Sequence, residues 1–203
     1  MKTILTIDFN IIMAPCIDLY NHLINEFDNL HDRIGSESLV WHGQAAMDIY
    51  SKLTNEIILD KFLEVDKDNI HFLHGQEDVL HFLDKNEDNH VYNIDFYSDT
   101  HEYNGTIDNR NWVTYGLNNG YIKNYEWIKA LNSPIVEGVE TPVTVEKAEL
   151  TLLPNIDQIF IASSEEWILP QYMPLFDLWL MISRKILGKN VNMEDYYQLR
   201  GEY

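Results

Sequence analysis

The chain has 203 residues, of which 45% are hydrophobic and 12% aromatic, and its formal net charge is −19. This length and apolar share predict a single domain over residues 1–203 with its own hydrophobic core, and they exclude a disordered chain. The charge argues against direct nucleic-acid binding, which needs a clustered basic surface, and equally against docking on an anionic membrane. Three explanations of the charge stay open: solubility, attraction of cations or a basic partner, and imitation of nucleic acid.

Cysteine usage and the N-terminal residues predict a cytoplasmic protein. Cys16 is the single cysteine, so no disulfide can form within the chain, as is typical of a reducing compartment. The apolar N-terminal run is interrupted at Asp8, which favours a first strand over a signal peptide. No apolar stretch approaches the roughly 20 residues that a membrane span needs.

Strand and helix patterns alternate through the first half of the chain. Apolar and β-branched runs predict strands over residues 3–9, 69–73 and 90–96. Apolar residues at helical spacing, or a start signal followed by such residues, predict helices over 17–27, 44–53, 56–62 and 75–83.

The second half continues the alternation with less regular connections. A polar loop is expected over 101–111, a strand or helix over 112–117, a helix over 121–131 and a long connection over 132–144. A strand or short helix over 145–153, a strand over 158–163 and a helix over 170–187 follow. The whole pattern predicts a single-domain α/β fold with a mainly parallel sheet and flanking helices.

Acidic and histidine residues concentrate in the middle of the chain. Residues 56–108 hold fourteen Asp and Glu against three Lys, and six of the eight histidines lie between His42 and His101. Carboxylates and imidazoles in one region are the ligand types that a divalent-metal site needs.

The end of the predicted strand 90–96 is the most chemically suggestive segment. Asp95, Tyr97 and Asp99 share one side if the backbone stays extended, and parallel α/β sheets bind ligands at the carboxyl ends of their strands. Polar groups also follow the other predicted strands, namely Asp8, His74, Glu165 and Glu166. We therefore expect these groups to converge, although Asp95 alone is equally explained as the cap of a turn.

Four segments together resemble a known family. They read NIHFLHGQEDVLHFL, VYNIDFYSDTHEYNG, NRNWVTYGLNNGYIKNYEWI and DQIFIASSEEWILPQY. The chain from residue 3 to about 186 resembles arginase-like (ureohydrolase-like) proteins, a group that includes peptide arginases and many phage proteins. The resemblance implies an arginase-like α/β fold.

The resemblance also implies a metal site. Ureohydrolases hold two manganese ions with an Asp-x-His-x-Asp strand end, an upstream histidine and a later acidic pair, and the metals activate a water. By resemblance, Asp95 and Asp99 match the two aspartates and His74 matches the upstream histidine, with Glu166 or His101 as acid/base. Tyr97 stands where the central histidine belongs. The later pair has no clean counterpart, the nearest candidates being Asp157 and the pair Glu165–Glu166.

Two functions follow from this degenerate motif. The first is an arginase-like scaffold acting as an acidic binding protein, whose partner is a basic host protein or an arginine-containing peptide. If the chain is phage-encoded, it would block a host or defence factor. The alternative is a metal-dependent hydrolase of a guanidino or amide C–N bond, using manganese or another divalent metal.

Overall fold

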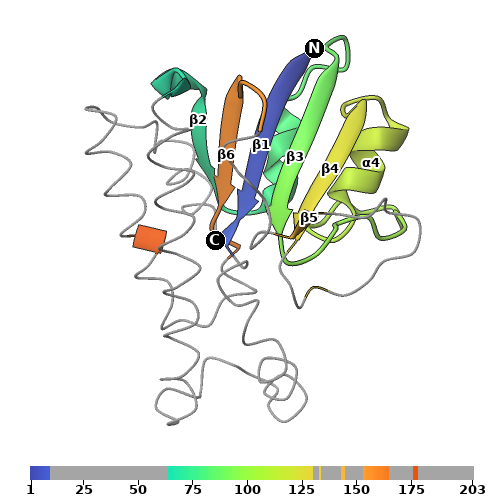
Figure 1. Cartoon of the computed structure of the whole chain (residues 1–203). Coiled ribbons are helices and arrows are strands. Elements are labelled where there is room, and N and C mark those ends of the chain that lie inside the picture. The colour runs from blue at the N-terminus through green and yellow to red at the C-terminus, as the bar shows by residue number, and fades with distance from the viewer. Residues whose placement is uncertain (10–63, 130–132, 134–142, 145–152, 165–175, 178–203) are drawn as a thin grey trace, which may run out of the picture.

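A computed structural model of the chain describes residues 1–9, 64–129, 133, 143–144, 153–164 and 176–177. These residues form a six-stranded sheet in the order β2-β6-β1-β3-β4-β5, in which every pair of neighbours is parallel (Figure 1). The strands are β1 (Lys2–Asp8), β2 (Ile70–Leu73), β3 (Asn89–Asp95), β4 (Asn124–Lys129), β5 (Val143–Thr144) and β6 (Gln158–Ala162). The predicted α/β class with a parallel sheet is confirmed.

The strands form where apolar and β-branched residues run without interruption. β1 is buried along almost its whole length, and β6 is buried at four of its five residues. Strands covered on both faces need such runs, because neither face meets water. The predicted strands 3–9, 69–73, 90–96 and 158–163 are confirmed within a residue or two at each end.

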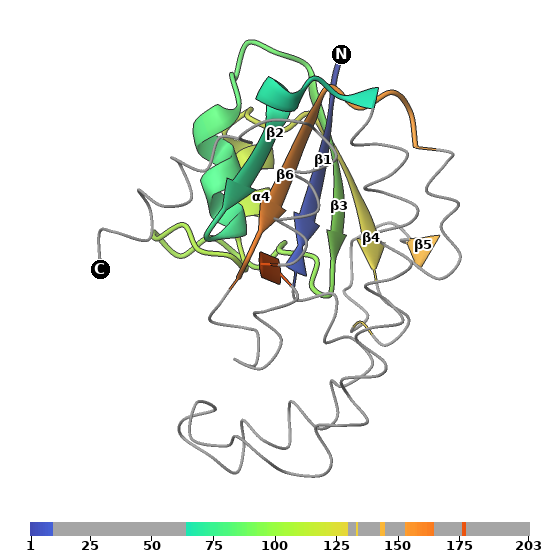
Figure 2. The same ribbon diagram turned by 90° about the vertical axis from the view of Figure 1, so that its left-hand side faces the viewer.

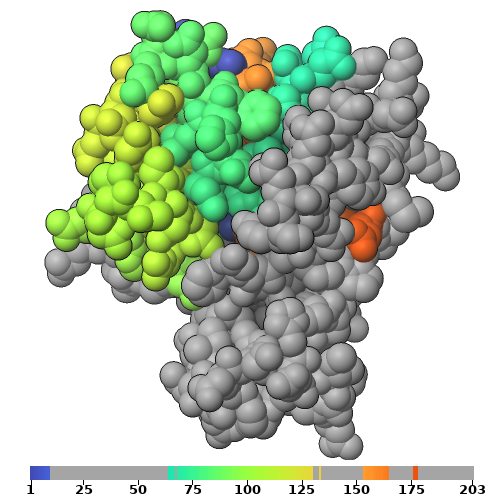
Figure 3. All heavy atoms as spheres, turned by 180° about the vertical axis from the view of Figure 1, so that it is seen from behind, coloured from blue at the N-terminus to red at the C-terminus, as the bar shows by residue number. Residues whose placement is uncertain are grey.

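Helices cover one face of the sheet. They are α4 (Trp112–Asn118) and the 3₁₀ helix η5 (Gln76–Phe82), and a second 3₁₀ helix, η4 (Lys67–Asn69), precedes β2. Figure 2 shows α4 and η5 on the same side of the sheet, and Figure 3 shows the surface that residues 64–129 make there. The predicted helix over 75–83 is confirmed, although it is wound as a 3₁₀ helix.

The packing of α4 depends on two glycines. A Cβ added at Gly116 would lie 2.7 Å from Ile122 Cδ1 and 3.2 Å from Leu80 Cδ2, so this position lets the helix approach its neighbours closely. Gly120 has a φ of +80° and follows the helix end. Its N–H donates to Leu117 O, and the next N–H donates to Gly116 O, which is a Schellman arrangement.

The expected helix over 121–131 is wrong, because residues Asn124–Lys129 form strand β4. This segment pairs with β3 along its whole length, which satisfies its backbone groups in the sheet. Two aromatic residues and an isoleucine within six residues favour a strand when a neighbouring edge is available. The expected connection over 132–144 likewise contains the short strand β5.

Several predictions fall outside the described residues. They are the helices over 17–27, 44–53 and 56–62, most of the segment 145–153, and all of the helix over 170–187 except residues 176 and 177. Within the part of the chain that the structure describes, no helix is long and apolar enough to cross a membrane.

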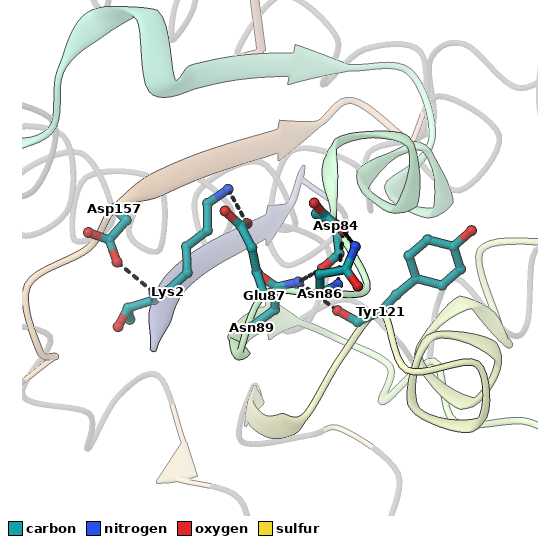
Figure 4. Close-up of polar contacts among 8 residues, drawn as sticks. Lys2, Asp84, Asn86, Glu87, Asn89, Tyr121 and Asp157 are labelled. Carbon is teal, nitrogen blue, oxygen red and sulfur yellow. Dashed lines mark hydrogen bonds and ion pairs between the residues drawn. The ribbon is translucent and has the colours of Figure 1, made fainter.

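The amino end of the sheet is held by matched polar contacts (Figure 4). Lys2 Nζ lies 2.9 Å from Glu87 Oε2, and the Thr3 N–H donates to Asp157 Oδ2 at 2.7 Å. The buried Asn89 donates through Nδ2 to Asp84 O and Tyr121 O, at 2.9 Å each. These contacts join the starts of β1, β3 and β6 to their connections and fix the register of the central strands.

Candidate functional site

Two aspartates end the central strands at the carboxyl edge of the sheet. Ile7 pairs with Ile94, so the next residues, Asp8 and Asp95, lie side by side where β1 and β3 end. Alternation from Ile4 and Val91, which join the core beneath the helices, directs both aspartates to the helix-covered face. Asp8 is 2% exposed and Asp95 is fully buried. The predicted convergence is therefore confirmed for these two strand ends.

A turn after β3 brings a third carboxylate to the same place. β3 ends at Asp95, and the Tyr97 N–H donates to Asp95 Oδ1 at 3.1 Å. Asp99 has a φ of +54° and is 3% exposed. The condition of an extended backbone through Asp99 is not met, because β3 ends at Asp95 and Asp99 has a positive φ. Tyr97 packs edge-on against Phe96, with ring centroids 4.8 Å apart.

The three carboxylates repel one another. The pKa of Asp99 is raised well above its ordinary value, first by burial and then by the charge of Asp95, a hydrogen bond with Asp95, and the charge of Asp8. The indole Nε1 of Trp112 donates to Asp99 Oδ2 at 2.8 Å and lowers the pKa in part. Burial and like charge both favour the neutral acid, so this cluster favours any positive group that enters it.

Gln76, at the start of η5, lies against two of these carboxylates. In one orientation of its amide, Nε2 donates to Asn93 Oδ1 and the carbonyl oxygen faces Asp95 and Asp99. In the other, Nε2 donates to Asp99 Oδ2 at 2.7 Å and to Asp95 Oδ2 at 2.8 Å. Ionised carboxylates would favour the second orientation, which also brings the Gln76 carbonyl oxygen against Asn93 and so requires the Asn93 amide to turn as well. A proton or cation between the oxygens would favour the first.

A buried polar network supports the site from the middle of the sheet. Thr6 Oγ1 contacts Asn93 Oδ1 at 2.6 Å, and Asn93 Nδ2 donates to the Tyr125 hydroxyl at 3.2 Å. Tyr125 in turn donates to Ser98 O at 2.7 Å, which holds the turn that carries Asp99. The pKa of Tyr125 is raised well above its ordinary value, first by burial and then by the charge of Asp99.

The turn after β6 adds a hydroxyl to the cluster. Ser164 Oγ donates to Asp8 Oδ2 at 2.7 Å, and Ser164 has a φ of +46°. Among the residues that the structure describes, Asp99 and Ser164 are the non-glycine residues with positive φ. Such backbone strain is concentrated at functional sites, where the surrounding structure holds it in place.

The other residues predicted for the site lie in different places. The carbonyl of His74 accepts from Ser164 N at 2.9 Å and from Ser163 Oγ at 3.3 Å, which puts the end of β2 beside the turn after β6. His101 has an exposed side chain, and its N–H donates to Arg110 O in the loop after Asp99. Glu165 and Glu166 lie outside the described residues. Asp157 is wrong as a site candidate, because it binds the Thr3 N–H at the amino end of β1.

Three contributors were not predicted from the sequence: Gln76, Ser164 and the indole of Trp112. Gln76 follows His74 by two residues, and the strand-to-helix turn places the Gln76 amide against Asp99. The ring of Trp112 is fully buried in the core, and its N–H also binds a carboxylate. Ser164 could have been identified from the sequence by its position directly after the predicted strand 158–163.

The described residues alone do not bring together the ligand set of a two-manganese centre, and the candidates Glu165 and Glu166 lie outside them. Within the described ranges, no group of three or more His, Cys, Asp or Glu side chains has an arrangement that holds a metal ion. By the resemblance, Tyr97 stands where a ligand histidine is expected, and the Gln76 amide lies against both Asp95 and Asp99. A single divalent ion held by His74, Asp95 and Asp99, as the resemblance implies, stays a prediction.

Fold and site together define an α/β protein with buried carboxylates at the carboxyl edge of a parallel sheet. Comparison of the chain with models of protein families, with curated proteins and with solved structures gives no match in any of the three. The arginase-like relationship therefore stays a proposal, which rests on the sequence motifs.

Proposed function

We propose that the chain is an arginase-like scaffold that acts as an acidic binding protein. Its carboxylates Asp8, Asp95 and Asp99 receive a positive group of the partner. The observation that carries the proposal is the gathering of three carboxyl groups, each at most 3% exposed, at one edge of the sheet. Burial and the two neighbouring aspartates raise the pKa of Asp99. A cation bound in the cluster neutralises the repulsion between the buried carboxylates. Because the folded chain already contains this repulsion, its removal contributes part of the free energy of binding.

The proposed class of partner follows from the negative charge of the cluster and from the two-oxygen geometry of a carboxylate. A guanidinium group offers paired N–H donors that match carboxylate oxygens two at a time. An arginine-containing peptide or an arginine of a basic host protein is therefore the proposed partner. The net charge of −19 assists by accelerating the approach of a basic molecule. If the chain is phage-encoded, capture of a host or defence protein is the corresponding role.

Titration calorimetry with a short arginine-containing peptide tests this proposal. We expect binding to the unmodified chain and a loss of about tenfold or more in Asp99→Asn, because one buried partner of a charge pair is removed. The control is Asp88→Asn, which removes an equal charge from an exposed residue and should leave the affinity within about twofold. Equal affinities for wild type and Asp99→Asn, or no binding at all, would reject the proposal.

A metal-dependent C–N hydrolase is the second candidate, and the Gln76 amide favours it. Turned toward the carboxylates, the Gln76 carbonyl oxygen would join Asp95 and Asp99 as a third oxygen ligand, a set that hard cations prefer. Elemental analysis of protein purified without chelator separates the two functions. Stoichiometric manganese, lost together with guanidino hydrolysis in Asp95→Ala, would favour the hydrolase. Metal-free protein that still binds the peptide would favour the binding function.

A further inference from the structure

Ser164 differs from an ordinary strand-end serine in its backbone and in its hydrogen-bond partner. It follows the central-sheet strand β6 by two residues and adopts a φ of +46°. For a residue with a Cβ this left-handed conformation costs on the order of 1 kcal/mol, and a glycine would adopt it freely. The Ser164 N–H donates to His74 O at 2.9 Å, which anchors the strained turn to the end of β2.

The hydroxyl of Ser164 is bound to a carboxylate that can accept its proton. Ser164 Oγ lies 2.7 Å from Asp8 Oδ2, and the two residues are 5% and 2% exposed. This is the separation at which a general base takes the proton of a nucleophile. In α/β hydrolases a nucleophilic serine occupies a strained turn after a strand, at the carboxyl edge of the sheet. The segment Ala162-Ser163-Ser164-Glu165-Glu166 lacks the glycines of that motif, so the likeness is one of geometry alone.

The adjacent serine provides an internal contrast. Ser163 is fully buried, its Oγ donates to the His74 carbonyl at 3.3 Å, and its N–H donates to Leu73 O at 3.0 Å. A backbone carbonyl does not take a proton from a hydroxyl, so Ser163 is held in place without being activated. Two consecutive serines of the same turn thus have different chemistry.

We propose that Ser164 is a nucleophile and Asp8 its general base, for transfer of the acyl group of an ester. Ser164 Oγ attacks the carbonyl carbon while its proton passes to Asp8 Oδ2. The bond from that carbon to the leaving oxygen then breaks, and the leaving oxygen takes the proton from Asp8. Water attacks the acyl-serine, gives a proton to Asp8 and releases the acid, and Ser164 recovers the proton. The net reaction is hydrolysis of one ester to an acid and an alcohol.

This inference goes beyond binding of a positive group and does not depend on it. The reacting group is a neutral ester, and the nucleophile lies in the turn after β6 rather than in the turn that carries Asp99. A neutral probe therefore tests Ser164 without involving the affinity for arginine.

The test uses p-nitrophenyl acetate with the full chain. We expect a rapid release of one equivalent of nitrophenolate and a single acetyl group on Ser164, located by fragmentation in the mass spectrometer. Ser164→Gly keeps the backbone conformation, because glycine tolerates the positive φ, and should abolish this adduct. Asp8→Asn keeps an oxygen at the hydrogen-bonding position but removes the base, and should slow acetylation on the order of 100-fold.

Ser163→Ala is the matched control and should retain the adduct and its rate. Thermal unfolding confirms that each variant is folded before it is compared. An acetyl group at the same position in Ser164→Gly, an unchanged rate in Asp8→Asn, or the absence of any adduct on wild-type Ser164 would overturn the proposal.

Discussion

The two ends of the parallel sheet hold charge in opposite ways. At the amino end, Lys2 meets Glu87 and both side chains are partly exposed, so each charge keeps water as well as a partner. At the carboxyl end, Asp8, Asp95 and Asp99 are each at most 3% exposed, and they act on one another as like charges. The amino end thus fixes register at little cost, whereas the carboxyl end gathers buried acids whose ionisation is opposed by burial and like charge.

The two ends of the sheet also differ in the backbone strain of their described residues. Asp99 and Ser164, the described non-glycine residues with positive φ, both lie at the carboxyl end. The described amino-end residues hold their connections through the amide of Asn89 and the carboxylate of Asp157, with no strain of this kind. A fold that needed only stability would have no reason to gather buried acids and strained turns at one edge, so the contrast points to function there.

Replacement of Trp112 should give the largest effect. Its fully buried ring fills the core under α4, and its indole N–H binds Asp99. We expect Trp112→Ala to lower the free energy of unfolding by about 3–5 kcal/mol. Trp112→Phe keeps most of the apolar contact but leaves Asp99 without this donor, at a cost of about 1–3 kcal/mol. Urea unfolding measures both, and a Trp112→Phe variant as stable as wild type would show that the indole N–H does not matter.

Replacement of Lys2 should give the smallest effect. Lys2→Ala breaks the ion pair with Glu87 at the amino end, where both partners are solvated. Such pairs contribute about 0.2–1 kcal/mol, and salt screens them. We expect a change within that range in urea unfolding, and a smaller one at high salt. A loss as large as that of Trp112→Phe would contradict the proposed contrast between the two ends.

The sequence predicted the sheet better than it predicted the site. Apolar runs identify buried strands directly, which is why residues 3–9, 90–96 and 158–163 were assigned correctly. β4 was missed because its apolar residues also fit helical spacing. The segment forms a strand rather than a helix because it pairs with the edge of β3. Tertiary pairing of this kind is not visible in a local pattern.

The site was predicted where it depends on strand ends and missed where it depends on turns. Asp95 and Asp8 follow from the rule that parallel strands end together. The contacts of Gln76 and Ser164 depend on the dihedral angles of two short connections, which the local composition does not specify. The connection after β2 places the Gln76 amide beside Asp95 and Asp99.

The pH dependence of stability tests most directly whether the carboxyl edge holds mutually repelling acids. Because the pKa of Asp99 is raised in the folded state, the folded chain binds this proton more tightly than the unfolded chain. The contribution of Asp99 to stability is therefore lost as pH rises from the ordinary aspartate pKa of 3.8 through the raised value. Each tenfold difference between the two acid constants corresponds to about 1.4 kcal/mol.

Unfolding free energies of wild type and Asp99→Asn, measured by urea from acid to neutral pH, provide the comparison. Asparagine keeps an oxygen for the Trp112 N–H but has no charge. We predict that Asp99→Asn is more stable than wild type at neutral pH and that this advantage shrinks as the pH falls toward the ordinary aspartate pKa. An Asp99→Asn variant that is less stable than wild type at neutral pH, and recovers on acidification, would contradict the account.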